Sequence, residues 1–570
     1  MSCYTKLLEY FLQRDRSWVL SLCAAACLVY LPFLGNPFVF DDIPFFSGNV
    51  ASQFTDSTPQ LNLRWLPYAS LGWTVAIFSD VVPHFFHLGN ALLHAANVIF
   101  LFYLLRLLAG AVIADNDNSR ALVWGAWLGA LVFACHPVAV YAVGYVIQRS
   151  ILMATFFTLL MQWAYARGLL TGRKRWLALA LPAYFLAGFS KEHSVMVLAV
   201  LAATTILLRK ENRASIHALW LTWVALAAVA LLVVLRAKGV FGVAYEPMAA
   251  HLFEQHGMAG QQVGDGDSNV QNLHLLSVLT QAGLFFKYLL LWVLPNPAWM
   301  SVDMREPFIA DYGMWQGWAG ALGFVLYGVL GCKLLLRGRW LGLTGLALLY
   351  PWLMFLVEFS SIRVQEPFVL YRSYLWMPGM MLFFPLLLAK PALSPSTKLG
   401  AGLVKGLPGR RVMLVLGCIV LLLVPLSWNR LWVFADTYRL WNDAAQLLHS
   451  DSAPGADRIF YNRGQAQATK HKWEGAIADF QRTVALSPQL APVRYELGVA
   501  YVNAQRYHEA IEQFDAEIAI KPDDARAYYG KGLALMGLHE GEQALQQMRR
   551  GCELGSEMVC SMAGWSQKRK

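Results

Sequence analysis

The stretch Phe38–Asp42, with the sequence FVFDD, places two adjacent carboxylates directly after a long apolar run. That run extends from Trp18 to Leu34 and is long enough to cross a membrane as a helix. Carboxylates in or beside lipid are costly and are retained mostly for function. Asp41 and Asp42 therefore either lie in a hydrated loop and cap the helix that follows, or take part in chemistry at the membrane boundary.

The composition is that of a polytopic membrane protein with a second part attached. Of its 570 residues, 57% are hydrophobic and only 14% are charged, and the mean hydropathy is +0.43. Soluble globular proteins do not have such a composition. Acidic residues are sparse up to about residue 430, whereas the remainder is rich in Asp, Glu, Gln and Ala. We therefore predict an all-α fold, with a multispan membrane domain over residues 1–430 followed by a soluble domain.

The net charge of +10 comes from basic residues in short loops between apolar runs. Examples are Arg173–Arg175, Arg209–Arg213, Arg337–Arg339 and Lys405–Arg411. Basic residues of this kind mark the cytoplasmic side of a membrane protein. The charge therefore indicates topology in a lipid membrane, and we expect no nucleic-acid partner.

The loop charges favour eleven spans, with the N-terminus in the cytoplasm and the C-terminus outside. No small-residue cleavage site follows the first apolar run, so we expect it to be retained. The outer loops are predicted at about 36–83 and 237–313, and the segment 61–78 is expected to form an amphipathic helix in the interface. The segment 276–294 is treated as re-entrant or surface-bound, because only then do all basic loops lie inside. The predicted spans are about 18–34, 84–107, 121–141, 150–170, 176–190, 194–208, 215–236, 314–335, 341–358, 373–389 and 412–428.

The soluble part repeats with a period of 34 residues. Tyrosine, glycine and alanine recur at equivalent positions, and proline closes two of the repeats. This spacing predicts three tetratricopeptide repeats and a C-terminal cap over 458–570, preceded by a linker helix at 431–457. Such solenoids bind extended peptides or partner proteins. The equivalent residues are Tyr461, Tyr495 and Tyr529; Gly464, Gly498 and Gly532; Ala476, Ala510 and Ala544; and Phe480, Phe514 and Met548.

Cysteine spacing shows no zinc motif. Five of the eight cysteines lie in apolar runs, where we expect them to pack as small core residues. Cys552 and Cys560 lie in the tail and can form a disulfide if the tail is outside the cytoplasm.

Polar residues recur at the outer ends of the predicted spans. Each has an ordinary interpretation: an Arg extends to headgroups, Lys191 and Glu192 form an ion pair, and His87 and His94 hydrogen-bond between helices rather than bind metal. Together on one membrane face, they suit a reaction on a lipid-linked phosphate, because Arg forks onto phosphate oxygens and a carboxylate can deprotonate a hydroxyl. The candidates are Asp41, Asp42, Arg64, His87, Asn90, His94, His136, Gln148, Arg149, Lys191, Glu192, His193, Asp303, Arg305, Arg363, Glu366 and Arg372.

The combination of motifs resembles one known family. The sequence is similar to the transmembrane and tetratricopeptide repeat-containing proteins, O-mannosyltransferase-like members of the GT-C glycosyltransferases. The short repeat array and the Gln148-Arg149 form are more similar to the bacterial branch. The matching pieces are FVFDD at 38–42, HLGNALLH at 87–94, HP at 136–137 with VIQR at 146–149, SKE at 190–192, SSI at 360–362, YRSYL at 371–375, and the repeats.

The resemblance implies a membrane glycosyltransferase of the extracytoplasmic face, in a bacterial inner membrane with periplasmic repeats. It would move a single hexose from a polyprenyl-phosphate donor to a hydroxyl of a protein Ser or Thr recruited by the repeats. Asp41 is expected to be the base and Asp42 to orient it, although the order within the pair is open. Phosphate contacts are expected from Arg149, Lys191, Arg372 and Arg64, with support from His87, Asn90, His94, Glu192, Asp303 and Glu366.

The sequence also departs from the family. Leu370 precedes Tyr371-Arg372 where relatives often have an acidic residue, and Glu358-Phe359 replaces Pro-Glu before Ser360. No cofactor is implied, although Asp41, Asp42 and Asp303 could hold a divalent metal. Two other functions stay open: a non-enzymatic scaffold for envelope or pilus assembly, and a glycan ligase or polymerase with the same donor.

Overall fold

The computed structural model describes residues 3–48, 50–55, 60–78, 80–113, 119–237, 268–309, 311–364, 366–388, 410–451 and 453–562. Within these ranges the chain forms α- and 3₁₀-helices and no β-strand, as predicted. The chain divides into two compact units. The first comprises Met1–Met300 and Phe308–Ala435, and the second comprises Ser301–Pro307 and Asp436–Lys570. Much of the predicted outer loop 237–313 and the basic loop around Lys405 lie outside the described residues.

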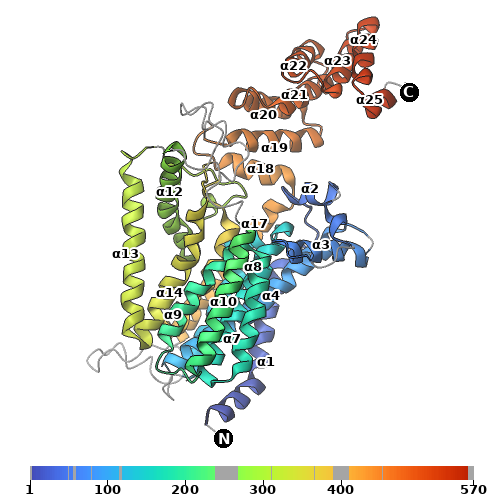
Figure 1. Ribbon diagram of the computed structural model, residues 1–570. Coiled ribbons are helices and arrows are strands. Elements are labelled where there is room, and N and C mark those ends of the chain that lie inside the picture. Colours follow the sequence, from blue (N-terminus) through green and yellow to red (C-terminus); the bar gives the residue numbers. More distant parts are fainter. Residues whose placement is uncertain are drawn as a thin grey trace. The chain divides into compact units, whose positions relative to one another are not determined.

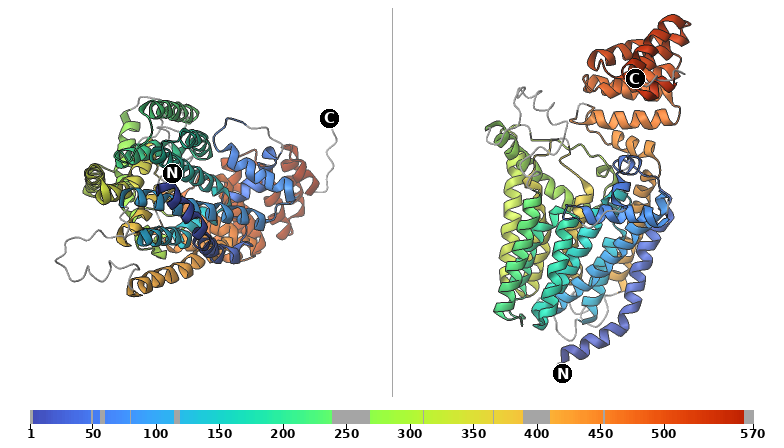
Figure 2. Two further views of the ribbon diagram at one scale, coloured as in Figure 1. Left: turned by 90° about the horizontal axis from the view of Figure 1, so that it is seen from below. Right: turned by 45° about the vertical axis from the view of Figure 1, so that its right-hand side comes forward.

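The first unit is a bundle of long helices that run side by side (Figure 1) and are seen end-on in the left view of Figure 2. Other helices lie between them. The helices of the bundle are α1 (Cys3–Tyr30), α4 (Pro83–Ile113), α5 (Ser119–Cys135), α7 (Arg149–Thr171), α8 (Lys174–Ser190), α9 (Val197–Leu207), α10 (Ile216–Arg236), α12 (Ser268–Val293), α13 (Trp315–Arg337), α14 (Arg339–Phe355) and α17 (Arg410–Phe434), of which α9 is much shorter than the rest. The others are α2 (Asp42–Ser47), α3 (Trp65–Phe78), α6 (Val140–Val143), α15 (Ser373–Trp376) and α16 (Phe383–Leu388).

Several of these helices suit a membrane. In the described part of the chain, six are long and apolar enough to cross one, and α5 with the bent segment after it makes a seventh. The predicted count of eleven is not confirmed. The helices of 176–190 and 194–208 are short, and 373–389 is broken into α15, a 3₁₀ segment and α16. The six are Arg16–Phe33, Pro83–Ile113, Ile216–Arg236, Leu273–Val293, Trp315–Arg337 and Arg339–Ser360.

Helix α12 contains the segment 276–294 that was left out of the predicted spans. By length and composition it is one of the six candidates. Its packing on α13 shows its direction, because a Cβ on Gly317, Gly320 or Gly323 would meet Leu279, Gly283 or Phe286 respectively. The contacts advance together along both helices, so α12 and α13 run in parallel. Two consecutive helices that both cross the membrane, joined by a loop on one side of it, run in opposite directions. Because α12 and α13 run in the same direction, they cannot both cross the membrane in this way.

The helices α2 and α3 lie at the end of the bundle opposite the N-terminus (Figures 1 and 2). The prediction that 61–78 is amphipathic was wrong. Helix α3 begins at Trp65 and is apolar on both faces: Ala69 and Leu71 are buried, while Ile77 and Phe78 are exposed. The hydroxyl groups of Ser70 and Thr74 do not form a polar face, because each hydrogen-bonds a backbone carbonyl of the preceding turn.

The second unit contains the helix pairs that the 34-residue period predicted. A glycine of the first helix in each pair lies against a large side chain of the second: Gly464 against Phe480, Gly498 against Phe514, and Gly532 against Met548. The fully buried alanines Ala476, Ala510 and Ala544 occur once in each pair. The helices are α18 (Thr437–Gln446), then the pairs α19 (Ala456–Thr469) with α20 (Trp473–Leu486), α21 (Ala491–Asn503) with α22 (Tyr507–Ile520) and α23 (Ala525–Gly537) with α24 (Gly541–Glu553), and finally α25 (Glu557–Met562).

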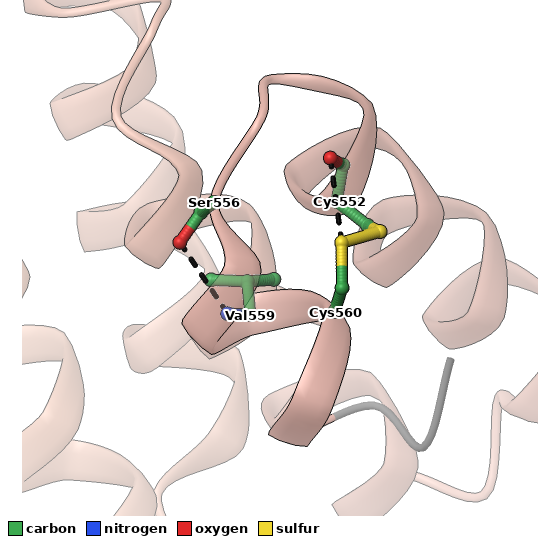
Figure 3. The surroundings of a disulfide bond; sticks show 4 residues. All are labelled: Cys552, Ser556, Val559 and Cys560. Carbon is green, nitrogen blue, oxygen red and sulfur yellow. Dashed lines mark hydrogen bonds between the residues drawn. A yellow bond between two sulfur atoms is a disulfide. The ribbon is translucent and has the colours of Figure 1, made fainter. Parts of the chain in front are cut away.

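A disulfide connects Cys552 at the end of α24 to Cys560 in α25 (Figure 3). It closes the turn between the last repeat and the terminal helix, and its two Cα atoms are 4.8 Å apart. Val559, the residue before Cys560, is buried and packs near Gly551. The disulfide therefore attaches the short α25 to the last repeat.

Candidate functional site

A cavity that is open to one side lies within the first unit where polar segments converge at the ends of several helices. Lys191–His193 come from the break between α8 and α9, and Arg64 immediately precedes α3. The other wall is formed by the end of α10 and the 3₁₀ segments after α14. The lining residues are Arg64, Lys191, Glu192, His193, Val195, Val233, Val234, Ala237, Val357, Ser360, Ser361, Arg363, Tyr371 and Arg372. The cavity therefore has a cationic side and an apolar side.

Arg64 and Glu192 form a forked ion pair at the cavity. Nε and Nη2 of Arg64 lie 3.1 and 2.5 Å from the two carboxylate oxygens of Glu192. Arg64 has φ +63°, a left-handed conformation that is uncommon for a residue with a side chain, and its N–H donates to the Phe189 carbonyl at 2.7 Å. Strained backbone persists where the surrounding structure fixes it, often at functional sites.

Glu358 is buried behind the cavity and joins three basic side chains. Its Oε2 accepts from Nη1 of Arg372 at 2.9 Å and lies 3.2 Å from Nε of Arg363. Its Oε1 lies 3.2 Å from Nε2 of His193. The side chain of Glu358 is only 1% exposed, so this carboxylate holds two guanidinium groups in place at the cavity wall.

Lys191 differs from the cavity arginines, because no carboxylate of the described residues lies within salt-bridge distance of its ammonium. Burial, and then the nearby Arg64, lower the pKa of Lys191 to about 7, although Glu192 opposes this effect. Among the described residues at this cavity there are four Lys and Arg side chains, Arg64, Lys191, Arg363 and Arg372, and two carboxylates, Glu192 and Glu358. This group of basic side chains suits a phosphate group.

Asp42 is fully buried in a backbone cage at the start of α2. Its Oδ1 accepts from the Ile147 N–H at 2.7 Å, and its Oδ2 accepts from the N–H groups of Val39 and Val146 at 3.4 and 3.3 Å. Burial raises the pKa of Asp42 to about 7, against the opposing effect of these donors. Asp41 is exposed. The two carboxylates therefore have different surroundings.

Tyr145 and Tyr371 connect the acidic pair to the cavity. The Tyr145 hydroxyl accepts from the Asp41 N–H at 3.0 Å, and the Asp41 carboxylate lies near the same hydroxyl. The rings of Tyr145 and Tyr371 have centroids 6.4 Å apart, and Tyr371 lines the cavity. Asp41 is thus connected to the cationic cavity through two aromatic side chains.

Arg149, an expected phosphate contact, does not line the cavity. Its guanidinium donates to Oδ1 of Asn90 at 2.9 Å, to the Phe86 carbonyl at 2.9 Å and to the Ser70 carbonyl at 3.2 Å. Asn90 in turn donates from Nδ2 to the carbonyls of Val143 and Val146. Arg149 and Asn90 therefore hold the segment before α7 against α3 and α4, and this segment carries the N–H donors for Asp42.

The remaining candidates lie elsewhere. His87 Nε2 bonds the Asn36 carbonyl, and His94 bonds the Tyr374 hydroxyl and the Ala134 carbonyl, so both histidines hydrogen-bond neighbouring segments as predicted. Asp303 belongs to the second unit, where Oδ2 accepts from Arg305 at 2.8 Å and from Nε of Arg458 at 3.0 Å. Glu366 is half-buried and does not line the cavity.

Two residues that complete the site, Tyr145 and Glu358, were not assigned a role from the sequence. Glu358 could have been found from the sequence, because it ends the predicted span 341–358 and acidic residues are costly beside lipid. Nothing in the local sequence distinguishes Tyr145 from other tyrosines. As for a metal, no three His, Cys, Asp or Glu side chains converge as ligands in the ranges that the structure describes.

Comparison with known proteins supports the repeats. Residues 495–557 match the tetratricopeptide repeat family. Among solved structures, the chain is similar to MamA, with 26% identity over 23% of this chain and 76% of that one and a TM-score of 0.19. It is also similar to YrrB, described as a tetratricopeptide repeat protein with an unusual peptide-binding site, with 19% identity over 27% of this chain and 82% of that one and a TM-score of 0.22.

A third solved structure is similar over a longer part of the chain. It is the archaeal oligosaccharyltransferase AglB from Archaeoglobus fulgidus, in complex with an inhibitory peptide and a dolichol-phosphate. The match covers 80% of this chain and 60% of AglB, with 14% identity and a TM-score of 0.38. A likeness at this level does not assign an activity to the chain. No curated protein matches the sequence, so the resemblance to the O-mannosyltransferase-like family is not confirmed.

Proposed function

We propose that the chain is a membrane glycosyltransferase that moves a single hexose from a polyprenyl-phosphate donor to a hydroxyl of a protein Ser or Thr. The observation that carries the proposal is the cavity with two unlike sides. Its cationic side suits a phosphate, and Val233, Val234 and Ala237 at the end of α10 suit the first part of a lipid chain. An acidic pair is connected to this cavity through Tyr145 and Tyr371.

In the proposed reaction the acceptor oxygen forms a bond to C1 of the sugar as the bond from C1 to the phosphate oxygen breaks. The electron pair of that bond leaves with the lipid phosphate, which gains negative charge. Lys191, Arg363 and Arg372 stabilise this charge. Asp41 takes the proton of the acceptor hydroxyl, as a general base. Asp42 accepts three backbone N–H donors and holds the loop.

The proposed topology has eleven spans, a cytoplasmic N-terminus and repeats outside the cytoplasm. The parallel direction of α12 and α13 supports a re-entrant α12. The disulfide supports an oxidising compartment for the repeats. In this arrangement, a reporter fused after Arg411 reports cytoplasm and one fused after Lys570 reports the outside.

The test compares the masses of intact envelope proteins from cells that carry the wild-type chain, Asp41→Asn, or the control Asp311→Asn. Asp311 is exposed and caps the Gly313 N–H, so Asp311→Asn tests loss of an outer carboxylate alone. We expect Asp41→Asn to lose a hexose-sized mass from particular proteins at normal expression, whereas Asp311→Asn retains it. Full modification in Asp41→Asn would contradict the proposal.

Two other outcomes would favour the alternatives. A change in lipid-linked or surface glycan with unmodified proteins would indicate a ligase or polymerase. No change in any protein or glycan would indicate a scaffold whose tetratricopeptide repeats recruit partners.

A further inference from the structure

We propose that Tyr145 is a positioning residue that fixes the orientation of Asp41 for proton transfer. The inference rests on the proposed function, because it concerns the same base. Its basis is a small set of contacts around the FVFDD loop.

Tyr145 restrains the backbone of Asp41. The Tyr145 hydroxyl accepts from the Asp41 backbone N–H at 3.0 Å, and the Asp41 carboxylate lies near the same hydroxyl. A phenol has one donor and can accept, so this hydroxyl can accept from the backbone while its proton is available to the carboxylate. The Tyr145 side chain is buried, with 2% of its surface exposed. A buried hydroxyl therefore restrains an aspartate that is itself exposed.

The backbone before Asp41 is strained, which makes this restraint necessary. Phe40 has φ +52°, and a left-handed conformation is a genuine outlier for a bulky aromatic residue. Such a conformation persists only where neighbouring contacts fix it. The rings of Phe40 and Tyr145 lie against each other, with centroids 6.1 Å apart. The N–H of the next residue, Asp41, donates a hydrogen bond to the Tyr145 hydroxyl.

One short segment restrains both carboxylates. Tyr145 bonds Asp41, and the next two residues, Val146 and Ile147, donate their N–H groups to Asp42. Asp42 thereby fixes the segment that carries Tyr145, and Tyr145 fixes Asp41. The expected orienting role of Asp42 is therefore indirect and passes through Tyr145.

The titratable groups that face Asp41 include Asp42 from α2, Tyr145 from the segment before α7, and Tyr371, whose ring is near that of Tyr145. Of these, the Tyr145 hydroxyl is the group that can donate a hydrogen bond to the ionised carboxylate. Its removal makes the base harder to ionise, so the acidic limb of the pH–rate profile should move to higher pH. The loss of one hydrogen bond corresponds to a displacement of about one pH unit.

The experiment uses the full-length protein in lipid vesicles, with polyprenyl-phosphate-mannose as donor and a Ser/Thr peptide taken from an acceptor that the mass comparison identifies. If the missing mass is another hexose, the donor carries that hexose. Tyr145→Phe keeps the ring and removes only the hydroxyl. We expect kcat to fall about 10- to 100-fold with an unchanged donor KM, because misorientation of a base costs rate rather than binding.

The matched control is Tyr350→Phe. Tyr350 is equally buried in the first unit, and its hydroxyl accepts from Gln162 Nε2 at 2.8 Å, away from the cavity. We expect its kcat and pH profile to equal those of the wild type. If Tyr145→Phe does not fold, 3-fluorotyrosine at position 145 keeps the ring and strengthens the O–H donor, and the acidic limb should then move to lower pH.

The outcomes separate the two proposals. Full activity of Asp41→Asn contradicts the proposed function itself. An inactive Asp41→Asn together with a Tyr145→Phe that has wild-type kcat and pH profile overturns only the positioning role. A fall in thermal stability with kcat and pH profile unchanged would show that Tyr145 is merely structural, and would also overturn it.

Discussion

The aspartates at positions 41 and 42 are neighbours in the chain but have opposite surroundings. The carboxylate of Asp42 is fully enclosed and accepts three backbone N–H groups, whereas Asp41 is exposed and donates its backbone N–H to the Tyr145 hydroxyl. An enclosed carboxylate that accepts backbone N–H groups at both oxygens is poorly placed to take a proton from a substrate. Asp42 is therefore expected to stabilise the loop and Asp41 to carry the chemistry.

This division predicts that Asp42→Asn destabilises the protein, in contrast to Asp41→Asn. In Asp42→Asn, the amide oxygen can take the place of Oδ1 and accept from the Ile147 N–H. The amide NH₂ group then takes the place of Oδ2, and it cannot accept from the N–H groups of Val39 and Val146. Unsatisfied buried donors cost roughly 1–3 kcal/mol each. Thermal unfolding in detergent should show a lower midpoint for Asp42→Asn and an unchanged one for Asp41→Asn.

The pH dependence of stability provides a second check of Asp42. Its pKa is raised to about 7, above the value for an unfolded chain. The group's contribution to stability is therefore full below about pH 4 and is lost as the pH rises to about 7. This slope should be absent in Asp42→Asn, and an unchanged slope would show that another group produces it.

At the scale of elements, Glu358 connects three short segments that have little regular structure of their own. They are the 3₁₀ turns Glu192–Met196, Leu356–Ser360 and Leu370–Arg372. The second turn carries Glu358 itself, the first contributes His193 and the third contributes Arg372. Arg363 comes from the loop between the second and third turns. The two arginines Arg363 and Arg372 of the cationic side therefore depend on one buried carboxylate.

We predict that Glu358→Gln is strongly destabilising and weakens donor binding. Removal of one partner of a buried ion pair leaves an uncompensated charge and costs about 3–5 kcal/mol. Glu192→Gln is the matched comparison, because Glu192 pairs with the more exposed Arg64 and should cost less. Thermal unfolding and binding of polyprenyl phosphate are the measurements. Equal unfolding midpoints for the two variants would contradict the central role of Glu358.

The sequence predicted some elements better than others for physical reasons. The repeats could be predicted from local spacing, because Gly464 and Phe480, like their equivalents, meet within one helix pair. The direction of α12 depends on close contact of Gly283 with Gly320, two residues from separate helices, which apolar runs do not encode. In the site, Arg64, Lys191, Glu192 and Arg372 line one cavity, whereas the contacts of Arg149 depend on backbone carbonyls that no side-chain pattern identifies.

For the whole molecule, the compartment of the repeats determines whether the proposed enzyme can act outside the cytoplasm. Disulfides form and persist in oxidising compartments and are rare in the cytoplasm. Cys552 and Cys560 are bonded, whereas Cys23, Cys27, Cys135, Cys332 and Cys418 are free. The cysteines of the bundle and those of the last repeat thus provide an internal comparison.

We predict that Cys552 and Cys560 are oxidised in intact cells. Cells are quenched with acid and denatured, and free thiols are then labelled with a maleimide polymer before and after reduction. The wild-type chain should gain two labels on reduction, and a Cys552→Ser, Cys560→Ser variant should gain none. Two extra labels without reduction would place the repeats in a reducing compartment. The proposed topology would then be wrong, because repeats in the cytoplasm could not present an acceptor on the other side of the membrane.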